Sequence, residues 1–76
     1  MRVALELVGI EMGRLGSGDT AEVEPSTTIE ALLRSHGTPE AVRALVLCLV
    51  NGKVERTSYV LAAGDRLKLF LPKAGG

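Results

Sequence analysis

The residues of this chain that are best suited to chemistry are the last two, Gly75 and Gly76, which follow the short segment 72–74. They place an α-carboxylate on a stem without Cβ atoms, which can enter a slot that a side chain would obstruct. A carboxylate resists nucleophilic attack at neutral pH, so this group would need activation before it formed a new bond. The alternative is a frayed terminus, because chain ends are commonly disordered. The residues before the two glycines therefore decide between these interpretations.

Few other side chains are candidates for chemistry. Cys48 is the only cysteine, which excludes internal disulfides, a zinc cluster and a four-thiolate iron–sulfur cluster. It lies in an apolar run, so we interpret it as a small buried hydrophobe rather than a reactive thiol. His36 falls in the last turn of a predicted helix, where a positive or polar group is favoured. No second ligand or nucleophile stands near it in sequence, so we interpret it as structural.

Length and composition indicate one folded domain, residues 1–76, with a flexible C-terminal tail at 72–76. The chain is 46% hydrophobic and 24% charged, which favours a globule over disorder. It has no run of 18 apolar residues and hence no predicted membrane span. Its start alternates and carries an acid early, unlike a signal peptide. We therefore expect a cytoplasmic protein.

Charge is balanced overall but unevenly distributed. The formal net charge is zero, which argues against general nucleic-acid binding. Residues 1–40 hold seven acids and three bases, whereas residues 41–76 hold two acids and six bases. The basic second half is interpreted either as a solvated face or as a surface for an acidic partner or a nucleotide-handling site near the terminus.

The first half predicts a hairpin followed by a helix. Residues 2–8 alternate as a half-buried strand, residues 9–18 form a glycine-rich loop with room for one helical turn, and residues 20–24 form a second strand. Thr27 is the predicted N-cap, and Glu30 completes a capping box with it. The helix then presents an apolar stripe and ends at a glycine, formed by Ile29, Leu32, Leu33 and Gly37.

The second half predicts three more strands. Residues 39–44 suit a short helical turn, and residues 45–50 are apolar on both faces. That strand either lies centrally in the sheet or keeps its second face for a partner. Asn51-Gly52 predicts a tight turn into a short strand at 53–55, and residues 56–65 connect it to the last strand, 66–71.

Alternation in the last strand points Leu67, Leu69 and Leu71 inward, and Phe70 outward with Arg66 and Lys68. The order of elements predicts an α+β fold in which a mixed sheet packs on one main helix. With the first and last strands central and parallel, this is the β-grasp (ubiquitin-like) architecture.

The pattern of residues 50–76 resembles the prokaryotic ubiquitin-like sulfur carriers of the ThiS/MoaD type. These are the small subunit of molybdopterin synthase and the sulfur carrier of thiamine biosynthesis. The resemblance rests on Val50-Asn51-Gly52-Lys53-Val54, Leu61, Gly64-Asp65-Arg66-Leu67, Phe70, Pro72 and Ala74-Gly75-Gly76. The stretch 69–76 is more similar to the molybdopterin type, which carries an apolar residue, a proline and a small residue before the glycines.

The resemblance implies that Gly76 is the reacting residue. An E1-like activating enzyme would adenylate its carboxylate with ATP, and a sulfurtransferase or cysteine desulfurase would supply a persulfide. The product is a terminal thiocarboxylate that donates sulfur. The carrier would contribute no catalytic side chain, bound cofactor or metal, and its role would be to present the reacting atoms to its partners.

Roles for the neighbouring residues follow from the same resemblance. Gly75 and Ala74 would keep the approach to a partner narrow, and Pro72 would stiffen the exit from the last strand. Phe70, with Leu71 and the outward residues of the 45–50 strand, would form an apolar docking patch. Its charged rim would comprise Arg66, Lys68 and Lys73. For Phe70 the alternative is an exposed aromatic covering its neighbours, and for the rim it is ordinary solvation.

Three functions remain open at this point. The first is a sulfur carrier, with molybdopterin synthesis favoured over thiamine, tRNA thiolation and cysteine synthesis; its acceptor would be a molybdopterin synthase large subunit or a thiazole synthase. The second is a protein modifier conjugated through Gly76 to a lysine. The third is a plain β-grasp interaction domain. A ferredoxin is excluded by the lack of cysteines, and scarce aromatics disfavour an RNA-binding domain.

Overall fold

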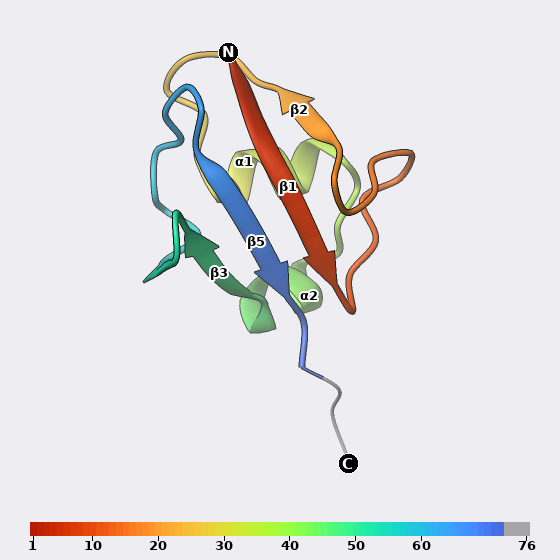
Figure 1. Ribbon diagram of the computed structural model, residues 1–76. Helices are drawn as coiled ribbons and strands as arrows, with labels where there is room; N and C mark the ends of the chain where they lie inside the picture. Colours follow the sequence, from red (N-terminus) through yellow and green to blue (C-terminus); the bar gives the residue numbers. More distant parts are fainter. Residues whose placement is uncertain (73–76) are drawn as a thin grey trace.

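The computed structural model describes residues 1–72, and its elements follow the predicted order. The main chain forms β1 (Arg2–Val8), β2 (Thr20–Glu22), α1 (Ile29–Ser35), α2 (Glu40–Leu45), β3 (Leu47–Val50), β4 (Lys53–Glu55) and β5 (Arg66–Phe70). The strands form one sheet in the order β2-β1-β5-β3-β4 (Figure 1). β1 and β5 are central and parallel, and the other neighbours are antiparallel. The β-grasp prediction, including its parallel pair, is confirmed.

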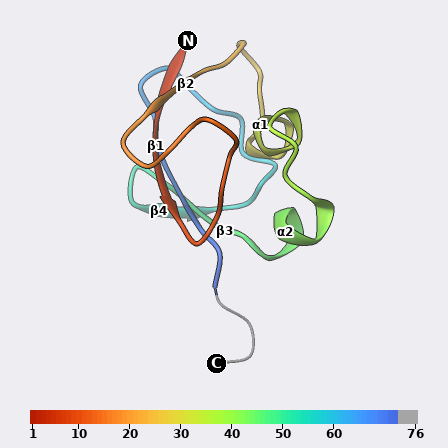
Figure 2. The same ribbon diagram turned by 90° about the vertical axis from the view of Figure 1, so that its right-hand side faces the viewer.

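Both helices cover the same face of the sheet (Figure 2). Alternate residues of the strands point towards them, because side chains on a strand alternate between its two faces. This face and the loops around it bury one apolar cluster: Val3, Leu5, Met12, Ala21, Val23, Ile29, Leu32, Leu33, Cys48, Val50, Leu61, Leu67 and Leu69. No helix or strand of the described residues covers the opposite face, which we call the open face (Figures 1 and 2).

The start of α1 differs from the prediction by one residue. The N-cap is Thr28, whose hydroxyl oxygen accepts a hydrogen bond from the Ala31 N–H at 3.0 Å. Thr27 instead belongs to the preceding turn, where its hydroxyl donates to the Glu24 carbonyl at 2.6 Å. With Thr28 as the cap, Glu30 lies too early for a capping box. Its carboxylate instead pairs with Arg43 of α2 at 2.7 Å and fastens the two helices together.

Three predicted strands are shorter in the structure, of which β5 ends one residue early, at Phe70. β2 ends at Glu22, because the chain turns just beyond it, where the Glu24 carbonyl accepts the Thr27 N–H at 3.2 Å. β3 begins at Leu47, because Leu45 is the last residue of α2. The tight turn at Asn51-Gly52 is confirmed, with φ of +53° and +84°. Two successive positive φ values match the twist of an antiparallel hairpin.

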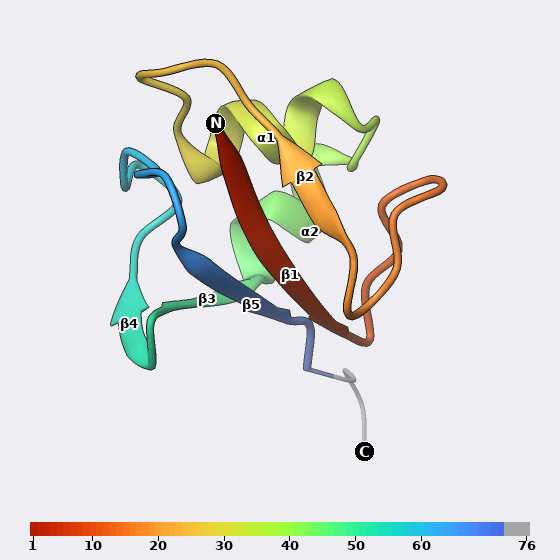
Figure 3. The same cartoon turned by 45° about the horizontal axis from the view of Figure 1, so that its top comes forward.

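The glycine-rich loop at 9–18 contains no helical turn, and it projects beyond β1 and β2 (Figure 3). Within the loop, an isolated β-bridge pairs Met12 with Leu15, and Met12 is fully buried. The loop therefore contributes a core residue that no periodic pattern indicated. It is fastened to the sheet by hydrogen bonds such as that from the Gly18 N–H to the Leu5 carbonyl at 2.8 Å.

Candidate functional site

The C-terminal segment leaves the sheet at the end of β5, next to the end of β1. The Leu71 N–H donates to the Val8 carbonyl at 2.9 Å, one step beyond the last pair of the ladder, Val8 with Phe70. Leu71 is half-buried and Pro72 is exposed. The other residues assigned to the tail, namely Lys73, Ala74, Gly75 and Gly76, lie outside the described residues.

An apolar strip lies on the open face beside this exit. It comprises five residues from four strands: Val8, Leu47, Leu49, Val54 and Phe70. The sheet register aligns Val8, Phe70 and Leu47 in one row and Leu49 with Val54 in the next row. Val54, Leu47 and Val8 are 65%, 41% and 37% exposed. The structure thus brings Phe70 together with the outward residues of β3 as expected, while docking at this surface stays a prediction.

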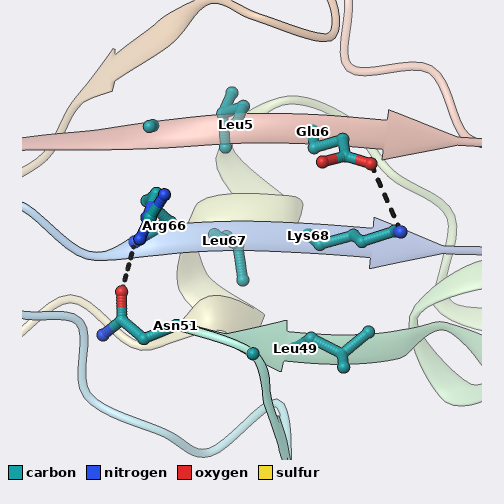
Figure 4. A pocket seen from close by; sticks show the side chains of 9 residues that line it. Leu5, Glu6, Leu49, Asn51, Arg66, Leu67 and Lys68 are labelled. Carbon is teal, nitrogen blue, oxygen red and sulfur yellow. Dashed lines mark hydrogen bonds and ion pairs between the residues drawn. The ribbon is translucent and has the colours of Figure 1, made fainter.

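The open face is polar towards the start of β5. Arg66 is exposed, and the Lys68 ammonium lies 3.3 Å from a Glu6 carboxylate oxygen across the β1–β5 pair (Figure 4). A shallow depression of about 430 Å³ lies over these strands, because small Ala4 stands in the same row as Arg66. Arg66 and Lys68 therefore border the apolar strip on one side, and Lys68 shares its charge with Glu6; their role as a rim for a partner stays a prediction.

Asp65, which the sequence placed in the connection before the last strand and among the residues of the family resemblance, is the centre of a buried network just before β5. It is 6% exposed, and its carboxylate accepts hydrogen bonds from Asn51 Nδ2 at 2.9 Å, from Ala62 N–H at 2.8 Å and from the Tyr59 hydroxyl at 3.1 Å. The Ala62 amide lowers the pKa of this carboxyl most, and Asn51 and Tyr59 lower it further, outweighing burial, which raises it.

The same network holds the turn between β3 and β4 against the start of β5. Asn51 Oδ1 accepts the Arg66 N–H at 2.9 Å, and the Arg66 carbonyl accepts the Asn51 N–H at 2.9 Å. Burial and the hydrogen bond to Asp65 both raise the pKa of Tyr59, so that its hydroxyl stays a donor. The Asn51–Asp65 contact spans 14 residues, and no local pattern predicts such a pairing.

The remaining candidates for chemistry have structural roles. Cys48 is 1% exposed, and burial raises the pKa of its thiol, as expected for a core residue. His36 is the C-cap of α1, and its Nδ1 lies 3.1 Å from the Leu32 carbonyl oxygen. Within residues 1–72, no group of three or more His, Cys, Asp and Glu side chains could hold a metal ion. Neither helix there is long and apolar enough to cross a membrane.

A β-grasp sheet with one face covered by helices defines a ubiquitin-like protein. Its fold is similar to that in the crystal structure of SAMP1 from Haloferax volcanii, with a TM-score of 0.68 and 22% sequence identity over the whole length of both chains. A search of curated proteins finds no match.

A sequence model of the ThiS family matches residues 6–76. The chain therefore belongs to the ThiS family, and the resemblance found from the sequence is confirmed. It is thus a ubiquitin-like protein of a family of small carrier proteins, whose members work with E1-like activating enzymes.

Proposed function

We propose that this protein is a sulfur carrier whose Gly76 carboxylate is adenylated and then converted to a thiocarboxylate. The observation that carries the proposal is the position of the exit: β5 leads from the core directly into the C-terminal segment, at the margin of the apolar strip. A partner that docks on the strip would hold the carrier while the segment reaches into its active site. Holding reacting groups in one geometry accelerates their reaction.

The chemistry uses only groups that partners and Gly76 supply. A Gly76 carboxylate oxygen attacks the α-phosphorus of ATP, and pyrophosphate leaves. A persulfide sulfur from a sulfurtransferase or cysteine desulfurase then attacks the carbonyl carbon, and AMP leaves. A second thiol cleaves the resulting acyl disulfide, which leaves sulfur on the carrier and a disulfide on the donor.

The pathway that we propose is molybdopterin synthesis. The support is the stretch 69–76, in which Phe70, Leu71 and Pro72 precede the final small residues, as in the molybdopterin type. Co-purification from the source cell distinguishes the pathways: a molybdopterin synthase large subunit supports the proposal, whereas a thiazole synthase or a tRNA-thiolating enzyme would assign the carrier to the alternatives.

The proposal is tested by intact mass spectrometry. We would incubate the purified chain with its cellular E1-like enzyme, ATP, a cysteine desulfurase and cysteine. The expected product is heavier by one oxygen-to-sulfur exchange, and fragmentation should place that exchange at Gly76. The mass of the untreated protein from the source cell checks that the mature chain ends there.

Two controls make the test decisive. A chain that lacks Gly76 should stay unchanged, and so should the complete chain without ATP. Absence of any mass change with several activating enzymes would contradict the proposal and would favour a plain interaction domain.

The protein modifier is the second candidate, because the same activated carbonyl can be attacked by a lysine amine of a target protein. The similarity to the ThiS family and to the fold of SAMP1 supports either use. Heavier adducts in cell extracts that disappear when Gly76 is removed would favour conjugation, and a thiocarboxylate without adducts would favour sulfur transfer.

A further inference from the structure

We propose that Gly9 is a positioning residue for the C-terminal segment, because it leaves the space that the Leu71 carbonyl occupies and so sets the direction in which the chain leaves the sheet. The inference rests on the proposed function, in which Gly76 must reach a reacting geometry inside a partner. It assigns a task to the first residue of the glycine-rich loop, for which the sequence indicated no role.

The contact lies where β1 and β5 end together. The parallel register runs from Ala4 with Arg66 to Val8 with Phe70, and the Leu71 N–H then donates to Val8. Gly9 follows with φ of +74°, and a Cβ at this position would lie 2.6 Å from the Leu71 carbonyl oxygen. Carbon and oxygen atoms that are not bonded do not approach so closely, so any other L-residue would force a shift in the backbone.

The backbone conformation of Leu71 sets the direction in which the chain leaves the sheet. Pro72 has no amide hydrogen, so the ladder cannot extend through it, and its ring fixes φ near −65°. A residue before proline is also restricted to extended conformations. The Leu71 amide is bonded to Val8 and its carbonyl packs against Gly9, so the orientation of the peptide that joins Leu71 to Pro72 is restricted from both sides.

A change of direction at this peptide alters the positions that the following residues can reach. A Cβ on Gly9 would force a shift of the backbone at this contact, and we infer that the Leu71 carbonyl gives way by a rotation of its peptide plane. Gly76 lies five residues beyond Leu71, and each residue adds up to about 3.3–3.6 Å of reach. A misplacement of about 1 Å in a reacting group is enough to cost about a hundredfold in rate.

Two other glycines of the same loop provide matched controls. Gly13 and Gly18 also have positive φ, +62° and +93°, but a Cβ at either position would meet no atom within 4 Å. Replacement by alanine costs backbone strain at all three positions. Only at Gly9 does it also displace the C-terminal segment.

The test compares Gly9→Ala with Gly13→Ala and Gly18→Ala. The first measurement is ATP–pyrophosphate exchange by the E1-like enzyme as the carrier is titrated. We expect Gly9→Ala to lower kcat about tenfold or more, while its KM stays within about twofold because the apolar strip is intact. The two controls should keep both parameters within about twofold. Equal losses in all three variants, or a loss confined to KM, would overturn the proposal.

The second measurement does not depend on activity. Residual dipolar couplings of the Leu71 amide and of the Leu71 Cα–C′ bond report the orientation of the exit. They should change in Gly9→Ala and match the unmodified protein in both controls; unchanged couplings in Gly9→Ala would overturn the proposal. If the unmodified carrier is not adenylated at all, the proposed function fails, and the couplings still decide the role of Gly9.

A further pair of variants covers the case in which Gly9→Ala does not fold. Asparagine tolerates positive φ better than alanine does, yet carries the same Cβ. Gly9→Asn should therefore fold and still show the altered couplings and the lower kcat, whereas Gly13→Asn should resemble the unmodified protein. If Gly9→Asn behaves like Gly13→Asn, the contact with Leu71 does not set the exit.

Discussion

The two ends of β5 are held differently. A buried polar network holds its start, whereas fewer hydrogen bonds hold its end, where the C-terminal segment begins. Asp65 and Asn51 together make seven hydrogen bonds around the start of the strand, one of them with each other. Beyond Phe70, within residues 1–72, the main chain is held by the hydrogen bond from Leu71 to Val8 and by the fit against Gly9. The difference indicates that β5 is anchored more strongly at its start than at its end, so that the engagement of Gly76 that we propose need not loosen the strand.

The largest effect on stability is expected from Asp65→Asn, at the start of β5. An amide at this position turns one acceptor oxygen into an NH₂ group that faces the donors of Asn51 or Ala62. Loss of a buried charge-assisted hydrogen bond should lower the free energy of unfolding by about 1–3 kcal/mol. Urea denaturation measures this, and Asp19→Asn is the matched control.

Asp19 is exposed, and its carboxylate accepts one hydrogen bond, from the Gly16 N–H at 2.7 Å. The Asp19→Asn variant should therefore lose about 1 kcal/mol of stability or less. Equal losses in the two variants would show that the network does not anchor β5.

Acidification should weaken the Asp65 network at the start of β5. The pKa of Asp65 is lowered in the folded protein, so its stabilisation is fully present above the ordinary value of 3.8 and is lost as the pH falls through the folded-state pKa. We therefore expect the difference in stability between the unmodified protein and Asp65→Asn to shrink below about pH 4. Thermal unfolding of both chains across pH 2–7 measures it, and a constant difference would contradict this assignment.

At the other end, Phe70→Ala should act on binding more than on stability. Phe70 is half-buried at the centre of the apolar strip, and aromatic residues in such places dominate interfaces. We expect the affinity for the activating enzyme to fall about tenfold or more, as measured by calorimetric titration.

Val60→Ala removes an apolar side chain that is 53% exposed and lies outside the strip, so it should leave the affinity unchanged within about twofold. Equal affinities of Phe70→Ala and the unmodified protein would remove the docking role of the strip.

The smallest effect is expected from Lys68→Ala. Its ion pair with Glu6 is solvent-exposed on both sides, and such pairs contribute about 0–1 kcal/mol. Stability should change within that range, and any change in the association rate with the activating enzyme should disappear at high salt. A salt-independent loss of affinity would mean that Lys68 is desolvated in the complex and is more than part of a rim.

The sequence predicted the elements that local patterns define and missed the contacts between distant segments. Alternation in residues 2–8 predicts a strand, and the Asn51-Gly52 dipeptide predicts a tight turn. Neither prediction needs information from distant residues. The cap of α1 was misplaced by one residue, because two adjacent threonines are equally suitable and the turn at Glu24 selects the second. Met12 was missed because a glycine-rich loop has no periodicity that would reveal a buried side chain.

The candidate site was predicted to a similar extent. Alternation placed Phe70 and Lys68 on the open face, but the partners that complete the strip, Val8 and Val54, come from strands whose alignment only the sheet register defines. The contact of Gly9 with Leu71 has the same origin, since the two residues are 62 positions apart. Such contacts depend on topology and leave no local trace in composition or spacing.

The burial of Cys48 makes sulfur loading easy to observe. The only thiol of the chain is shielded by the core and its pKa is raised, so alkylating reagents should spare it in the native state. A carrier loaded with sulfur would then present one nucleophilic sulfur, at its terminus. Iodoacetamide labelling of the folded protein should therefore count loaded molecules directly, without a mutant that lacks cysteine.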